Sequence, residues 1–311
     1  MALPAYVVRH GLPVYPQPVR CGGMTMSLFV LPSNDMAALQ SLVDVQLNAP
    51  MGQDGRFRVV APIVTLSIAE IDLVASEVPP FTTMGALSEH EAAFWIPILD
   101  TKATGVQPLS FMNPYIFVDN PLALTAGREL EGFFKDPAEV TLPTASAPGP
   151  FAVDALTVVS FGPGATVTRE RLVEVIPPAT PGGAVIADGR AALDTVRALV
   201  RGLGDLGRDW HEAMALIHTL EQHALQSVLL KQMRDVVDSL RACYQAVVQV
   251  PLVVTAFESL RVLDAHQITI TSTDSHPLAT SLGLDATQSS LIALTVRFDA
   301  QVPNGQILWQ A

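Results

Sequence analysis

The chain has 311 residues, of which 49% are hydrophobic and only 15% are charged, a balance that favours a folded core over disorder. Its formal net charge of −12 argues against a nucleic-acid-binding protein, which needs a basic face. Cys21 and Cys243 are too few for a disulfide framework or a cysteine metal site, so we expect small buried side chains in a reducing compartment.

The N-terminus lacks the charged start and apolar run of a signal peptide, and no apolar stretch reaches membrane-spanning length. The nearest such stretch, 247–257, is interrupted by Gln249 and Pro251. We therefore expect a cytoplasmic protein that has no contact with membranes and forms one domain over residues 1–311.

Short strands separated by proline-rich and glycine-rich breaks are predicted through most of the chain. An irregular arm over 1–20 comes first, and the helix that follows the first strand has Asn34 or Asp35 as its N-cap. The predicted strands are 24–31, 56–68 (one or two strands), 91–100, 115–118, 151–161, 169–176, 246–257, 262–271 and 291–298. The predicted helices are 36–45, 121–130, 191–200 and a long amphipathic segment over 209–244.

The stretch 113–137 organises the rest of the chain. A short aromatic strand is followed by the turn Asp119-Asn120-Pro121, a helix, and then two phenylalanines before Lys135. Lys135 is one of only three lysines, and burial behind aromatic rings would lower its pKa and leave a neutral, nucleophilic amine. The structural alternative is a surface lysine at the end of a strand.

Residues 118–120, residues 126–130, the aromatic pair and Lys135 together resemble the signature of the acetoacetate decarboxylase superfamily. The resemblance places Lys135 on that family's Schiff-base lysine. Phe134 stands where the family has proline, and Asp136 stands where it has a second lysine that is thought to lower the pKa of the first. A carboxylate in that position would act in the opposite direction.

The same resemblance implies further site residues. Glu91 lies six residues before Pro97, as the family's active-site glutamate does, and would move a proton or hold a polar substrate group; Glu89 is the alternative. Arg20 is the candidate for an arginine that precedes the family's first strand. We expect Arg20 and Phe134 to bind substrate.

The resemblance runs from about residue 20 to the end of the chain. It includes 275–284 and 302–308, which are similar to the family's C-terminal segments. The segment 189–244 is interpreted as a helical insertion, which would cover the site, pair with a partner subunit or only extend the fold.

Other motifs carry less weight. The run 202–207 reads Gly-x-Gly-x-x-Gly but follows a helical pattern, whereas a dinucleotide fold needs it after a buried strand. His211, His218 and His223 lack metal-ligand spacing, and we interpret His276 as structural. We expect no metal and no cofactor.

The sequence thus predicts an α+β fold with an antiparallel, barrel-like sheet, flanking helices and a helical insertion. The leading hypothesis is a homo-oligomeric carbon–carbon lyase that acts on a small keto acid through a Lys135 Schiff base, with decarboxylation as one reaction. Two alternatives stay open: an aldolase–dehydratase or cyclase for pyruvate-like substrates, and a non-catalytic barrel that binds small molecules.

Overall fold

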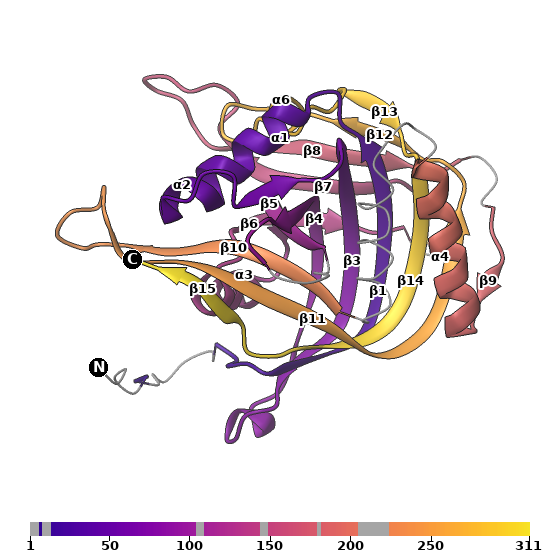
Figure 1. Cartoon of the computed structure of the whole chain (residues 1–311), viewed down its shortest axis with the longest axis horizontal. Coiled ribbons are helices and arrows are strands. Elements are labelled where there is room, and N and C mark those ends of the chain that lie inside the picture. Colours follow the sequence, from indigo (N-terminus) through magenta and orange to yellow (C-terminus); the bar gives the residue numbers. More distant parts are fainter. Residues whose placement is uncertain (1–5, 8–13, 104–108, 144–148, 179–181, 205–223) are drawn as a thin grey trace.

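The computed structural model describes residues 6–7, 14–103, 109–143, 149–178, 182–204 and 224–311 (Figure 1). The described strands are β1 (Val19–Pro32), β2 (Phe57–Val59), β3 (Ile63–Ser76), β4 (Leu87–Asp100), β5 (Ser110–Val118), β6 (Lys135–Thr141), β7 (Phe151–Thr157), β8 (Thr168–Ile176), β9 (Val185–Ile186), β10 (Ala224–Arg234), β11 (Ala242–Leu263), β12 (Gln267–Ile270), β13 (Thr287–Ser289), β14 (Ile292–Val302) and β15 (Gln306–Gln310). The described α-helices are α1 (Met36–Val43), α2 (Ala49–Met51), α3 (Pro121–Ala126), α4 (Gly189–Gly204) and α6 (Leu278–Leu282). Shorter helical turns are η1 (Asp44–Asn48), η2 (Phe81–Thr83) and η3 (Gly127–Glu131).

The sheet closes on itself. Hydrogen-bonded pairing runs from β5 through β10, β11, β14, β1, β3 and β4, and β4 pairs with β5 again. Figure 1 shows the long members of this ring, β1, β3, β14 and β11, curving side by side. The predicted α+β class is confirmed. The sheet, which was predicted to be antiparallel and barrel-like, forms a ring that is mostly antiparallel, but β5 pairs in parallel with both β6 and β10.

β5 is the branch point of the sheet. Its beginning, Ser110 and Phe111, pairs with β10, whereas its end, Ile116–Val118, pairs with β6. The two partners therefore share one edge of β5, and β6 leads into the second branch, β7, β8, β12 and β13. This split places the start of β6, at Lys135, beside the ring.

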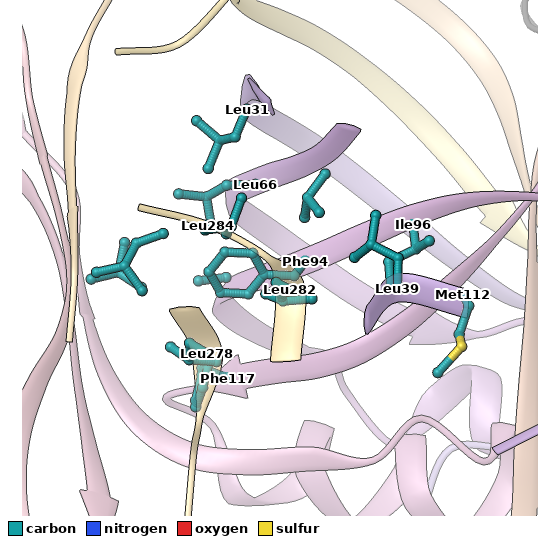
Figure 2. Close-up of a cluster of buried hydrophobic side chains, with 14 of the residues drawn as sticks. Leu31, Leu39, Leu66, Phe94, Ile96, Met112, Phe117, Leu278, Leu282 and Leu284 are labelled. Carbon is teal, nitrogen blue, oxygen red and sulfur yellow. The ribbon is translucent and has the colours of Figure 1, made fainter. Parts of the chain in front are cut away.

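Apolar side chains are buried on both faces of the ring, because successive residues of a strand point to opposite faces. Phe29 and Leu31 of β1 join the larger core, which Figure 2 shows where β-strand side chains such as Phe94 meet those of α1 and of residues 278–284. Met24 and Met26 of the same strand join a second cluster. The candidate site described below lies against this second cluster.

The predicted helical insertion is wrong over 224–244. α4 is a helix and packs through Ala192 against Leu260 and Leu294 on the outside of β11 and β14. Residues 224–244, however, form β10 and the start of β11, which pair antiparallel. The rest of the long helical prediction, 209–223, lies outside the described residues, as do its three histidines.

The physical reason for this error is that short apolar runs fit both periods. Leu225, Val228 and Leu229 satisfy helical spacing, but the same residues sit in a strand whose every backbone position is paired with β11. Tertiary pairing overrides local preference in such runs.

The longest helix among the described residues is α4, which has 16 residues. No helix among the described residues is long and apolar enough to cross a membrane.

Candidate active site

The turn between β5 and β6 delivers Lys135 to the ring. Asn120 caps α3, its side-chain oxygen accepting a hydrogen bond from the Leu122 backbone N–H at 2.9 Å, and Pro121 is the first helical residue. The helix then widens into the π-turn η3 and ends at Gly132, whose φ of 84° favours glycine. The chain re-enters the sheet with Lys135 opposite Ile116 of β5.

Lys135 is buried, with 6% of its surface exposed, and its amine meets two carboxylates. Nζ lies 2.9 Å from Oε2 of Glu91 and 3.2 Å from Oε2 of Glu89. Both glutamates come from β4, where their spacing of two residues places them on one face of the strand. The structure thus brings Lys135 and Glu91 together, as predicted. Glu89, which the sequence offered as the alternative to Glu91, contacts Lys135 as well.

Glu131 supplies a third carboxylate on the same cavity, from the last position of η3. Its Oε1 accepts a hydrogen bond of 2.8 Å from Nε2 of Gln17, in the arm before β1. The sequence did not single out Glu131, because the predicted α-helix ended at residue 130 and a π-turn has no spacing signal that separates it from an α-helix.

The carboxylates reverse the expected electrostatics of Lys135. Burial disfavours its ammonium form, but Glu89, Glu91 and Glu131 together outweigh burial and raise the pKa of Lys135 above its ordinary value. Burial raises the pKa of Glu89 and raises that of Glu131 to about 7, although in both cases Lys135 acts against the shift. The expectation that burial lowers the pKa of Lys135 is therefore wrong, because the neighbouring carboxylates outweigh burial.

Asp136 does not act on Lys135 as the sequence suggested. Neighbouring residues of a strand point to opposite faces, so the Asp136 carboxylate turns away and lies 3.4 Å from Nε2 of His276. Nδ1 of His276 is 2.9 Å from the Ser275 hydroxyl and 3.2 Å from that of Thr157. His276 is thus a buried, hydrogen-bonded histidine away from the amine.

The three carboxylates and Lys135 line a cavity of about 120 Å³, several times the roughly 10–15 Å³ that one water needs. Its walls are otherwise mostly apolar and include Trp95, Ile116, Phe133 and Leu252. Space, apolar walls and a few convergent polar groups are the ordinary composition of a small-molecule site.

Other polar groups on the cavity are uncharged. Asn113 and Ser227 lie on neighbouring strands, and the Ser227 hydroxyl donates to Oδ1 of Asn113 at 2.9 Å. Cys21 also lines the cavity, and burial raises the pKa of its thiol to about 12, so it is not a thiolate nucleophile near neutral pH. Cys243, which we expected to be buried, is exposed.

Two predicted substrate-binding residues lie away from the cavity. Arg20 is exposed on β1, because strand alternation turns it outward while Val19 and Cys21 face in. Phe134 is 61% exposed, with the Arg128 guanidinium 4.2 Å from its ring centre, and Phe133 lines the cavity in its place.

Among the described residues, no group of three or more His, Cys, Asp or Glu side chains is arranged to hold a metal ion. The polar groups that line the cavity include one amine, three carboxylates, the Asn113 amide and the Ser227 hydroxyl.

The raised pKa of Glu131 predicts a pH-dependent stability. A carboxyl whose pKa is about 7 in the folded protein and 4.5 ordinarily stabilises the fold fully below about pH 4.5, and this contribution is lost as pH rises through about 7. Glu131→Gln keeps a neutral side chain at every pH and can still accept from Gln17. We expect the melting temperature of the natural protein, relative to that variant, to fall between pH 5 and pH 8. If the difference in melting temperature between the natural protein and Glu131→Gln did not change with pH, the raised pKa of Glu131 would be contradicted.

Comparison with known proteins places the fold. No protein-family model matches the sequence, and no curated protein matches it. Solved structures do match over nearly the whole chain. Acetoacetate decarboxylase from Legionella pneumophila subsp. pneumophila str. Philadelphia 1 aligns with a TM-score of 0.63 at 12% identity, covering 100% of this chain and 93% of its own.

Two further solved structures have a similar fold. The enduracididine biosynthesis enzyme MppR complexed with pyruvate aligns with a TM-score of 0.60 at 12% identity, covering 98% of this chain and 99% of its own. An acetoacetate decarboxylase-like enzyme from Sphingomonas wittichii RW1 aligns with a TM-score of 0.55 at 16% identity and the same coverage. At these identities the likeness establishes the fold that the sequence resemblance predicted.

Proposed function

We propose that this chain, which has the acetoacetate decarboxylase-like fold, is a lysine Schiff-base enzyme that makes or breaks a carbon–carbon bond next to the carbonyl of a small substrate. One observation carries the proposal: the buried amine of Lys135 lies on a mostly apolar cavity, within 3.2 Å of two carboxylates. Decarboxylation and aldol-type reactions both use the same iminium as an electron sink.

The resting ammonium must first lose a proton. Glu91 and Glu89 are both within proton-transfer distance of Nζ, and the raised pKa of Glu89 makes that carboxylate a ready acceptor. A substrate that displaces water from the cavity lowers the local dielectric and favours the neutral pair of amine and carboxylic acid over the ion pair.

The neutral amine then attacks the carbonyl carbon. The carbonyl oxygen takes the stored proton, and the nitrogen loses one of its own to a carboxylate. The resulting carbinolamine expels water as its hydroxyl is protonated, which leaves the iminium. The carboxylates thus return every proton that they accept. When the bond next to the iminium carbon breaks, its electron pair becomes the C=C bond of an enamine, and the C=N π pair moves to nitrogen.

Borohydride trapping tests the proposal. Borohydride reduces an iminium to a stable secondary amine, and a chain with three lysines allows the adduct to be assigned by peptide mass mapping. We expect modification of Lys135 and not of Lys231, although burial lowers the pKa of Lys231, whose ammonium donates to the Leu130 carbonyl at 2.8 Å. Modification of Lys102 and Lys231 alone would overturn the assignment.

Gly127→Ala tests whether the lysine needs its observed position. A Cβ at residue 127 would lie 2.9 Å from Cε and 3.0 Å from Cδ of Lys135, so the flexible lysine must move. The backbone of Gly127 is helical, with φ of −59°, and accepts alanine. We expect a folded variant whose trapping rate falls at least tenfold.

The matched control is Gly202→Ala in α4, where an added Cβ meets nothing within 4 Å. It should be trapped at the rate of the natural protein. If Gly127→Ala and Gly202→Ala were trapped at the same rate, the position of Lys135 beside η3 would not matter for Schiff-base formation.

A second candidate function is a small-molecule-binding protein without catalysis. The raised pKa of Lys135 favours it, since a lysine that stays charged is not a nucleophile. Carbonyl compounds that shift the melting temperature yet never form an adduct on Lys135 would establish that alternative. The mass of any adduct that does form separates simple imines from the dehydrated or cyclised products of an aldolase–dehydratase or cyclase.

A further inference from the structure

We propose that the substrate carries no carboxylate and is an uncharged or positively charged ketone or aldehyde. The inference rests on the proposed Schiff-base function and narrows its substrate class. It departs from the keto acid that the sequence predicted.

The charges on the cavity are the first observation. Lys135 is the one cationic side chain among the described residues that line it, and Glu89, Glu91 and Glu131 face the same space. With Glu131 protonated, two carboxylates still face one ammonium. A substrate carboxylate would add another negative charge to a buried site that already has an excess of them, which is costly without a partner.

No second cation within the described part of the chain is placed to offset that charge. Arg20 is exposed on the outer side of β1, and the Arg128 guanidinium stacks on the exposed ring of Phe134. Lys231 does not line the cavity, and its ammonium donates to a backbone carbonyl. When Lys135 becomes an iminium, its single positive charge is already balanced by its own carboxylates.

Asn113 is the second, independent observation. It lines the cavity, is 4% exposed, and its Nδ2 has no hydrogen-bond partner among the described residues, while its Oδ1 is occupied by Ser227. A buried amide N–H without a partner costs free energy, and this one belongs to a residue of the cavity wall, where a bound ligand can complete it. The Asn113 amide is a neutral donor, which suits a carbonyl or hydroxyl oxygen of the substrate. It would not compensate the full negative charge of a substrate carboxylate.

The reaction follows from this substrate class. A carbonyl compound without a carboxylate has no carbon dioxide to lose, but its iminium on Lys135 can give up an α-proton to Glu91 or Glu89. The C–H electron pair becomes the C=C bond of an enamine, and the iminium π-pair moves to nitrogen. The enamine carbon then attacks an aldehyde, whose oxygen takes up the proton; the reverse sequence cleaves a β-hydroxy ketone.

Trapping with matched carbonyl pairs tests the proposal. The compounds are acetoacetate and methyl acetoacetate, pyruvate and pyruvamide, and the pair hydroxyacetone and aminoacetone. Each rate of adduct formation on Lys135 is divided by the rate with Nα-acetyl-lysine, which removes differences in intrinsic reactivity. We expect the four compounds without a carboxylate to label Lys135 at least tenfold faster than acetoacetate and pyruvate.

Faster or equal labelling by the two acids would overturn the substrate class while leaving the Schiff-base function in place. Failure of all six compounds on folded protein would overturn the Schiff-base function itself, and this inference with it. The two failures are therefore distinguishable.

Glu131→Gln provides a second readout. At pH 8, above the pKa of about 7 of Glu131, this change removes a negative charge and should speed labelling by pyruvate severalfold more than labelling by pyruvamide. Glu129→Gln is the matched control, since Glu129 lies two residues away, accepts from the Tyr6 hydroxyl at 2.8 Å and does not line the cavity. An identical pyruvate-to-pyruvamide ratio in both variants would contradict the charge argument.

Discussion

Lys135→Arg is expected to abolish turnover of any carbonyl substrate found by trapping, and to abolish the borohydride adduct. A guanidinium cannot become neutral in a protein and cannot form an iminium, but it preserves the cation that Glu89 and Glu91 require. The variant should therefore fold, with a melting temperature close to that of the natural protein, while its activity falls to background.

Arginine is more informative than alanine at this position. Lys135→Ala leaves the buried carboxylate of Glu89 without a cation, and breaking a buried ion pair in this way costs about 3–5 kcal/mol. Loss of activity in the alanine variant could then result either from unfolding or from removal of the reacting amine. Lys231→Arg is the matched control and should keep full activity; substantial turnover by Lys135→Arg would exclude the Schiff base.

Glu91→Gln is expected to slow turnover by about 10²–10⁴-fold, the usual contribution of a positioned acid or base. The same change removes one of the carboxylates that raise the pKa of Lys135. The amine should therefore become neutral at lower pH, so the pH of half-maximal trapping moves down even as turnover falls. If Glu91 had a purely structural role, Glu91→Gln would not lower both turnover and the pH of half-maximal trapping.

Glu70→Gln is a suitable control, because Glu70 is an exposed carboxylate on β3 that lies 3.9 Å from His90. It should leave both turnover and the pH of trapping unchanged. A Glu91→Gln enzyme with unchanged turnover would show that Glu89 alone handles the proton, which the double variant would then test.

Local chemistry in the sequence was sufficient for the approach to Lys135. The turn Asp119-Asn120-Pro121, Pro121 at an early helical position and the aromatic strand before them each act over a few residues, and the structure has all three. The many short strands and their breaks likewise predicted the class of the fold. Such features are determined locally, because neighbours in the chain decide them.

Contacts between distant segments decided the rest. Pairing with β11 made residues 224–234 a strand although their spacing also fits a helix. Strand alternation turned Arg20 and Asp136 away from the cavity, and a π-turn brought Glu131 into it. The pKa of Lys135 depends on β4, β6 and η3 meeting in one buried place, and Coulomb energies there follow distances in space that the order of residues does not encode.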